Sequence, residues 1–400
     1  MNLSTYDFNA NLHLFEQGDQ RVVLDVNSGS LHSLDVCAWE ALNLLIECQG
    51  DWEAVLAQLG STYGEQEAKE VISELKLLGE EGSLFTSDSG PYEPNFPENP
   101  VIKAICLHVA HDCNLRCEYC FAGTGDFGGD RSLMSLEVGK QAIKFVLEKS
   151  GHRKHCEVDF FGGEPLVNFQ VVKELVEFGR EEAAKLGKTL KFTLTTNAVL
   201  LDEQVRDFLE KNEISVVLSL DGRKEINDKM RPGIDGSGSY DEIVENIQAF
   251  VAQRPNPSPY AVGNYYYVRG TYTHHNLDFD QDVIHMADLG CKQISVEPVV
   301  AGPEDHYAFQ TEDLDILSKS YERLAEEYMA RKNTPEEFNF FHFNLELGKG
   351  PCLPKRLSGC GAGHEYLAVS PEGDLFPCHQ FVGKEQFKVG NVFSGDINLD

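Results

Sequence analysis

The sequence has few basic residues and no long apolar run. Its 34 Lys and Arg residues stand against 65 Asp and Glu residues, which gives a formal net charge of -31. Because proteins bind phosphate backbones chiefly through Lys and Arg, this balance argues against a nucleic-acid substrate. No apolar stretch approaches the roughly 20 residues that span a bilayer, and residues 1–7 lack the basic and apolar regions of a signal peptide. We therefore expect a cytoplasmic protein without a membrane partner.

The chain is long enough for several cores and rich in clustered cysteine. Its 400 residues, 42% of them hydrophobic, suit two or three domains. Eleven cysteines are present, several of them at short spacings. In a chain of this length, such clusters favour a metal cofactor in a reducing compartment over a set of disulfides.

Three cysteines follow the short β-branched run 101–110, which we expect to form a strand. Cys113, Cys117 and Cys120 would then lie in a loop at the end of that strand. A zinc site usually has four ligands in two close pairs, so three cysteines without a nearby fourth leave one coordination position open. Cysteine thiolates also hold four-iron four-sulfur clusters. Three protein ligands would keep one iron free for an outside molecule, as a catalytic site requires.

The spacing Cys-x3-Cys-x-aromatic-Cys resembles that of the radical S-adenosylmethionine (radical SAM) enzymes. The resemblance implies that Cys113, Cys117 and Cys120 hold a [4Fe-4S] cluster. When reduced, this cluster cleaves S-adenosylmethionine to methionine and a 5'-deoxyadenosyl radical. Cluster and radical then carry the chemistry, so no protein side chain is assigned a catalytic role.

Six strands and six helices alternate between residue 101 and about residue 331. The expected strands are 101–109, 156–161, 190–195, 214–218, 261–268 and 293–296. The expected helices are 136–149, 171–186, 203–209, 240–252, 277–289 and 313–329. Such alternation predicts an α/β fold with a parallel sheet and right-handed crossovers. It resembles the partial (β/α)6 barrel of radical SAM enzymes, with the chemistry at the carboxyl ends of the strands.

The second expected strand ends in a Gly-Gly-Glu-Pro turn. Gly162 and Gly163 let the backbone approach a ligand closely, and Glu164 can accept hydrogen bonds from an ammonium group. Alone, these residues could form only a turn. One strand after the cysteine loop, they match the radical SAM motif that holds the methionyl amine of the cofactor.

Further polar residues stand at the ends of later strands. By the same resemblance, Ser219 contacts the ribose or carboxylate of the cofactor, and Arg231 pairs with the carboxylate through its guanidinium fork. Tyr119 would pack near the adenine. For Asn197 and Asp221 a cofactor role stays open, since Asn and Asp at strand ends often serve only as turn formers.

Residues 1–85 are expected to form a separate small domain. Apolar segments at 12–14, 22–24 and 31–34 predict short antiparallel strands, and helical spacing follows, notably at 65–78. This order resembles the winged-helix recognition domain that binds leader peptides in ribosomal-peptide modification systems. The helical segment from 65 is acidic, so peptide capture at a strand edge is a better hypothesis than DNA binding. An inert structural cap is the alternative.

The Pro-rich segment 86–100 is expected to be a semi-rigid linker to the barrel, residues 101–335. In residues 336–400, Cys352, Cys360 and Cys378 resemble the opening of the SPASM extension, which carries auxiliary iron-sulfur clusters. We expect these three to bind a first auxiliary [4Fe-4S] cluster, with a zinc knuckle as the alternative. A full SPASM module needs further cysteines downstream of residue 400, so we expect a truncated one.

Three segments together resemble the maturases of small Cys-rich "six cysteines in forty-five residues" (SCIFF) peptides: the acidic N-terminal domain, the run from Cys120 to Ser135, and residues 160–168. The resemblance implies intramolecular thioether formation in a Cys-rich precursor peptide with a leader, supported by an external electron donor. Formylglycine formation of the anaerobic sulfatase-maturase type is the enzymatic alternative. A non-catalytic iron-sulfur scaffold that binds peptides is the alternative of another class.

Overall fold

The computed structural model describes residues 2–88, 101–254, 265–344 and 360–398. These residues divide into two compact units. The first contains residues 2–88, and the second contains residues 101–254, 265–344 and 361–398. No helix within these ranges is both long and apolar enough to cross a membrane.

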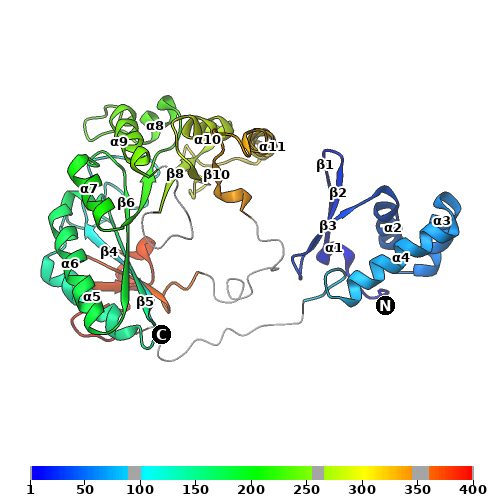
Figure 1. The fold of residues 1–400 in the computed structure, drawn as a ribbon, viewed down its shortest axis with the longest axis horizontal. Coiled ribbons are helices and arrows are strands. Elements are labelled where there is room, and N and C mark those ends of the chain that lie inside the picture. Colours follow the sequence, from blue (N-terminus) through cyan, green and yellow to red (C-terminus); the bar gives the residue numbers. More distant parts are fainter. Residues whose placement is uncertain (1, 89–100, 255–264, 345–359, 399–400) are drawn as a thin grey trace. The chain divides into compact units, whose positions relative to one another are not determined.

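The first unit, blue in Figure 1, is a three-stranded antiparallel sheet followed by helices. Its elements are α1 (Phe8–Asn11), β1 (Leu12–Gln17), β2 (Gln20–Asp25), β3 (Leu31–Leu34), α2 (Val36–Glu47), α3 (Trp52–Tyr63) and α4 (Glu65–Glu80). The side chains of Asp35 and Asp51 cap the first turns of α2 and α3. Buried residues from the sheet and the helices share one core, which explains why the short strands are stable. The expected order of strands and helices is thus confirmed.

Ten strands of the described second unit form one sheet, in the order β10-β9-β8-β7-β6-β5-β4-β11-β12-β13 (Figure 1). The strands are β4 (Ala104–Ala110), β5 (His155–Gly162), β6 (Thr189–Thr196), β7 (Ser215–Ser219), β8 (Tyr266–Tyr272), β9 (Gln293–Pro298), β10 (Asn339–Phe340), β11 (Tyr366–Val369), β12 (Asp374–Phe376) and β13 (Gly390–Asn391). Pairing is parallel from β10 to β11 and antiparallel beyond it. The carboxyl ends of the parallel strands therefore meet at one edge, where the predicted motifs lie.

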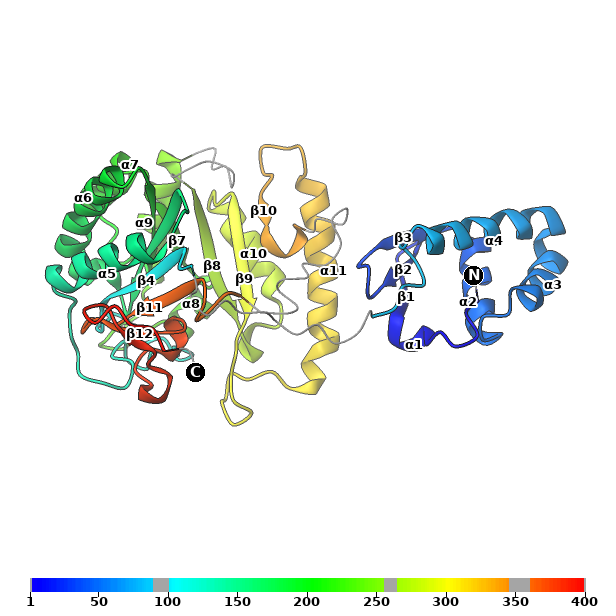
Figure 2. The same ribbon diagram turned by 90° about the horizontal axis from the view of Figure 1, so that it is seen from below.

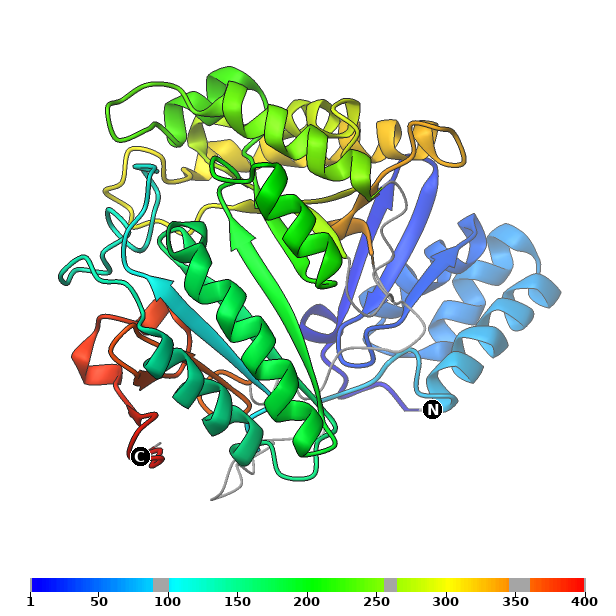
Figure 3. The same cartoon turned by 60° about the vertical axis from the view of Figure 1, so that its left-hand side comes forward.

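Helices cover the outer face of this sheet (Figure 1 and Figure 3). They are α5 (Leu136–Lys149), α6 (Phe169–Lys185), α7 (Glu203–Lys211), α8 (Lys224–Met230), α9 (Tyr240–Gln253), α10 (Phe279–Asp288) and α11 (Leu314–Arg331). Alternate strand residues, for example Phe160, Leu194 and Val268, are buried with helix residues in one core. The intervening residues point to the inner face, which is largely polar.

The six expected strands correspond to β4 through β9, in the expected neighbouring order. The expected fifth strand, 261–268, ended four residues too early, because β8 runs from Tyr266 to Tyr272. Residues 261–264 of that expected strand lie outside the described residues. Apolar and polar residues alternate along β8, so the sequence does not show clearly where this strand ends. The short α8 was not predicted, since it buries only Asn227 and Met230 and has little apolar pattern.

The C-terminal part of the second unit adds a hairpin to the sheet. β11 lies beside β4 in parallel, and β12 returns antiparallel to it (Figure 2). Gly373 in the connecting turn has a φ of 90°, which glycine adopts without strain. Most of the expected linker, residues 89–100, lies outside the described residues.

Candidate functional site

A half-buried loop directly after β4 carries three cysteines, Cys113, Cys117 and Cys120. The backbone N–H of Leu115 donates a hydrogen bond to Cys113 Sγ over 3.4 Å. Burial raises the pKa of the Cys113 and Cys117 thiols to about 11 and raises that of Cys120. Without a metal these thiols are protonated at neutral pH, so metal binding would release protons.

Tyr119, between the second and third of these cysteines, is tied to the end of β7. Its hydroxyl lies 2.7 and 2.9 Å from the two carboxylate oxygens of Asp221, and Arg231 Nη1 donates to it over 3.2 Å. Asp221 also accepts from the backbone N–H of Thr271, at the end of β8, over 3.0 Å. Burial raises the pKa of Asp221, while the Arg231 charge lowers it. The cysteine loop is therefore fastened to two further strands.

Arg231 is buried at the centre of the site. Its charge favours ionisation of Cys113, Cys117 and Cys120 and of Glu164. Its Nε has no hydrogen-bond partner among the described residues. A buried donor without a partner is costly, and an anionic ligand would satisfy it.

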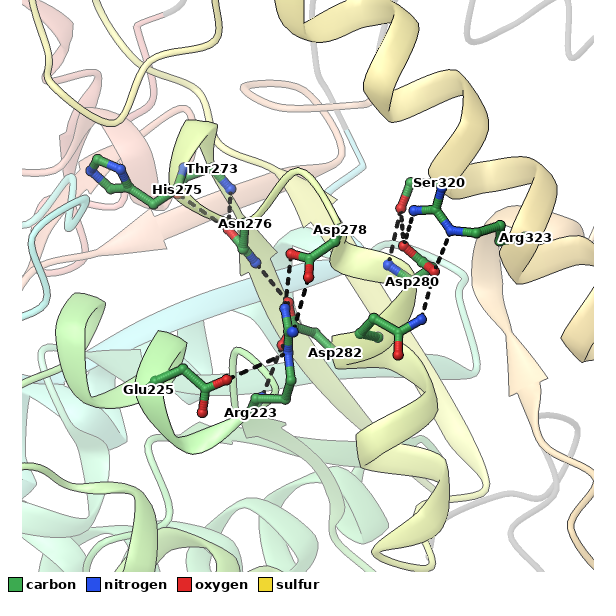
Figure 4. A network of polar contacts seen from close by, with 11 residues as sticks. Arg223, Glu225, Thr273, His275, Asn276, Asp278, Asp280, Asp282, Ser320 and Arg323 are labelled. Carbon is green, nitrogen blue, oxygen red and sulfur yellow. Dashed lines mark hydrogen bonds and ion pairs between the residues drawn. The ribbon is translucent and has the colours of Figure 1, made fainter.

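A network of ion pairs holds the turn after β7 against α10 (Figure 4). Arg223 Nε lies 2.8 Å from buried Asp282, and Arg223 Nη2 lies 2.9 Å from Asp278. Gly222 has a φ of 122°, and a Cβ there would collide with Asp282. The close packing of Gly222 on Asp282 fixes the backbone that presents Asp221.

The turn after β5 packs against the cysteine loop through two glycines. Gly163 donates its N–H to Ala110 O over 2.8 Å, and Glu164 donates its N–H to Asp112 O over 2.9 Å. A Cβ at Gly162 would collide with Ala110, and a Cβ at Gly163 with Asp112. Only glycine lets the two backbones approach this closely.

The carboxylate of Glu164 is buried among donors from its own turn and from the end of β6. Oε1 accepts from Leu166 N–H over 3.0 Å and from the Thr196 hydroxyl over 2.8 Å. Oε2 accepts from Asn197 N–H over 2.7 Å, which leaves one acceptor position among the described groups. Burial raises the pKa of Glu164 to about 7. An ammonium ligand at the remaining position would favour the ionised form.

Sequence reasoning left Asn197 and Asp221 open as simple turn formers, and it did not single out Thr196. Asn197 Nδ2 donates to Asn114 Oδ1 over 2.7 Å and lies 3.7 Å from Cys113 Sγ. All three strand-end residues thus contact the cysteine loop or Glu164. Their position directly at the ends of strands was the available signal, since parallel strands end at one edge.

The C-terminal cysteines are less well assembled within the described residues. Cys378 is half-buried, and buried Cys106 shares a hydrogen bond with the Tyr366 side chain. Cys360 is exposed and groups with the first unit. Cys352 lies outside the described residues. Cys106, in β4, belongs to a small core on the inner face of the sheet, against which the predicted cluster ligand Cys120 packs.

Residues 107–283 match the model of the radical SAM superfamily. Over these residues, which are less than half of the chain, the protein is similar to that superfamily. The match begins in β4, before the three cysteines, and ends in α10, so it includes the cysteine loop, Glu164 and Arg231.

Two curated relatives and one solved structure resemble more of the chain than these residues. A cysteine-type anaerobic sulfatase-maturating enzyme of Clostridium novyi is 24% identical over 292 residues, which are 71% of this chain and 75% of that protein. The radical SAM cyclopropyl synthase TigE of Paramaledivibacter caminithermalis is 28% identical over 301 residues, which are 69% of this chain but only 57% of TigE.

The solved structure is Streptococcus suis SuiB bound to its precursor peptide SuiA. At 18% identity and a TM-score of 0.53, it covers 96% of this chain and 86% of its own. At that identity the likeness concerns the fold. It extends beyond residues 107–283 over nearly the whole chain.

The residues at the carboxyl ends of the parallel strands suit an iron-sulfur cluster and S-adenosylmethionine. Thiolates are the ligands that iron-sulfur clusters prefer, and the three cysteines lie in one loop. No group of three or more His, Cys, Asp or Glu among the described residues is placed to hold a single metal ion. A four-iron cluster does not require that geometry, because each cysteine binds a different iron. The unpartnered Arg231 Nε and the open acceptor position of Glu164 suit the carboxylate and the amine of an amino acid.

Proposed function

We propose that the protein is a radical SAM peptide maturase that forms intramolecular thioether crosslinks in a small Cys-rich, ribosomally made peptide. The observation that carries this proposal is the fold likeness to SuiB, a protein solved with a precursor peptide, over 96% of the chain. A radical SAM domain and a domain for peptide capture would thus be joined in one chain. The SCIFF-like runs around Cys120 and Phe160 favour thioether chemistry.

Each part of the strand-end site would have its own task. Cys113, Cys117 and Cys120 would hold the [4Fe-4S] cluster, which together with S-adenosylmethionine supplies a hydrogen-abstracting radical when bound. Glu164 would accept hydrogen bonds from the methionyl amine, and Arg231 would pair with the methionyl carboxylate. Tyr119, Ser219, Gly162 and Gly163 would shape the rest of the cofactor site.

The first unit would capture the leader of the peptide. Its sheet ends in β3, a strand of four residues that is partly exposed and pairs with β2 on one side. An extended peptide can add to such an edge through main-chain hydrogen bonds. The neighbouring α4 begins with Glu65 and Glu67 and offers no basic surface for nucleic acid.

The test is anaerobic incubation of cluster-loaded enzyme with S-adenosylmethionine, a reductant and a Cys-rich peptide. We expect each crosslink to remove the mass of two hydrogen atoms from the peptide and to release 5'-deoxyadenosine. Deletion of residues 1–85 should mainly weaken peptide binding and leave cofactor cleavage intact. Release of deoxyadenosine without any peptide product would contradict the proposal.

Formylglycine formation is the second candidate, because the sulfatase-maturating relative matches 71% of the chain. The same assay separates the two reactions by mass. Conversion of Cys to formylglycine removes sulfur from the peptide, whereas a thioether retains it. A sulfatase-type peptide that loses sulfur in the assay would favour this second candidate.

A further inference from the structure

The inner face of the sheet carries an arginine at a position that faces away from the helices. Along β8, Tyr266, Val268, Gly270 and Tyr272 are buried, and three of these pack in the helix-covered core. The intervening residue Arg269 is exposed. Since side chains alternate between the faces of a strand, Arg269 points to the inner face. Parallel sheets normally bury both faces, so a charged residue here suits a face that receives a ligand.

Glu297, a carboxylate on the neighbouring strand β9, already has other donors. It accepts from the Ser295 hydroxyl over 2.7 Å and from His342 Nε2 over 3.0 Å. The Arg269 charge acts on Glu297 and on His379, but its guanidinium has no ion pair or hydrogen bond within the described ranges. Arg269 is therefore a cation on the inner face of the sheet whose hydrogen-bonding capacity is unused among the described residues.

The register places Arg269 beside the predicted cofactor site. Ser219 at the end of β7 pairs with Arg269, which in turn pairs with Ser295 on β9. Neighbouring strands lie about 4.8 Å apart, and residues in register on parallel strands point to the same face. A group bound by Arg269 would thus lie one strand away from Ser219. The peptide must bring the atom that reacts to the cofactor site at Ser219.

We propose that Arg269 binds a carboxylate of the peptide substrate, either an Asp or Glu side chain or the C-terminus. This rests on the proposed function. A guanidinium fork holds a carboxylate through two parallel hydrogen bonds, so it fixes position as well as charge. The chain carries a net charge of -31, which repels an acidic peptide. At Arg269 the local positive charge makes the interaction with a carboxylate attractive. Arg269 therefore selects where along the peptide an acidic group stands relative to the reacting residue.

The probes are fluorescein-labelled synthetic Cys-rich peptides that contain Asp and Glu. Matched copies carry Asn or Gln at each acidic position in turn, and one copy has an amidated C-terminus. Binding to cluster-loaded enzyme with S-adenosylmethionine is measured by fluorescence anisotropy. R269M should weaken binding of an acidic peptide by about tenfold or more, and R269K should recover part of it. Against the copy that lacks the recognised carboxylate, wild type and R269M should bind equally.

The matched control is K191M. Lys191 also lies on the inner face of the sheet, on β6, five residues before that strand ends at Thr196. This is a distance of about 17 Å along the strand, so K191M removes one positive charge elsewhere. It should leave the affinity for every peptide unchanged. Equal weakening of acidic and amidated peptides by R269M, an unchanged affinity, or weaker binding of S-adenosylmethionine alone would each overturn the proposal. Charge-dependent binding without a crosslinked product would uphold Arg269 and contradict the thioether reaction instead.

Discussion

The fold fixes the surroundings of the three cysteines after β4 more firmly than those of the C-terminal cysteines. The loop with Cys113, Cys117 and Cys120 is fastened to the ends of β5, β6, β7 and β8 by hydrogen bonds through Glu164 and Asp221. Cys378 lies on a short 3-10 turn after a two-strand hairpin, and Cys360 is exposed. The first site is organised before any cluster binds, because the sheet fixes its surroundings.

This difference predicts which cysteine site responds to substitutions that are far from its cysteines in sequence. A strand-end site built from several strands depends on contacts far from the cysteines in sequence, such as Tyr119 to Asp221. A site on a hairpin depends more on its own ligands. Substitutions around the two sites should therefore have effects of different range and size.

The largest expected effect is that of Cys117→Ala. Removal of one of three thiolates leaves the cluster with two ligands in the loop, so cluster content and deoxyadenosine formation should be lost entirely. Cys378→Ala should retain deoxyadenosine formation, because the strand-end site does not use it. Iron and sulfide content, electron paramagnetic resonance and deoxyadenosine release check both variants. Equal loss in both would remove the distinction between the sites.

Gly163→Ala tests the packing of the Glu164 turn on the cysteine loop. The added Cβ meets the Asp112 carbonyl, so a backbone must shift, and we expect a loss of about 1–3 kcal/mol in the free energy of unfolding. Cluster content should fall with it. Gly60→Ala is the matched control, because its Cβ would find ordinary contact at 3.6 Å within a helix. Urea unfolding and iron content compare the two, and equal stability would contradict close packing at the turn.

Asp221→Asn tests the tie between β7 and the loop. It removes a buried negative charge that faces Arg231 and weakens the bond from Tyr119, so cluster retention should fall about tenfold, as for other groups behind metal ligands. Tyr119→Phe keeps the Asp221 charge and should have a smaller effect. The rate of iron loss to a chelator measures both. Wild-type iron retention in Asp221→Asn would show that the cysteine loop keeps its structure without the Asp221 carboxylate.

Much of the fold could be predicted because helix-facing residues alternate or repeat at regular spacing. The strands β4 to β7 and β9, and helices such as α5, were predicted within a few residues. The end of β8 was misplaced because its inner face is as polar as a loop. α8 was missed because its seven residues bury little apolar surface.

The site was less predictable than the fold. The cysteines and the Gly-Gly-Glu turn are contiguous motifs, so sequence alone brings their members together. Asp221 binds Tyr119 across 102 positions and Asn197 meets Asn114 across 83, so no local pattern pairs them. Only the sheet order makes these strand ends neighbours. For the same reason Cys106 and Arg269, both on the inner face, could not be recognised before that face was known.

The smallest expected effect concerns Asp159, whose charge acts on Cys106 and Tyr366 near Cys378. Burial raises the pKa of Asp159 to about 7 from 3.8. The folded state then binds more protons than the unfolded state between these values, so its stability should fall as pH rises from about 4 to about 7. Asp159→Asn should remove this fall, a difference of about 2 kcal/mol between pH 5 and pH 8 after allowance for partial exposure.

Urea unfolding of wild type and Asp159→Asn at both pH values measures this difference, because every other titrating group is common to both proteins. Asp19→Asn, in the exposed turn between β1 and β2, controls for the loss of one negative charge. The same pH dependence in wild type and Asp159→Asn would mean that Asp159 has an ordinary pKa and that water reaches this part of the inner face. In that case the surroundings of Cys378 would be as solvated as those of Cys360. The C-terminal cysteines would then differ from the strand-end site even more than the buried position of Cys106 implies.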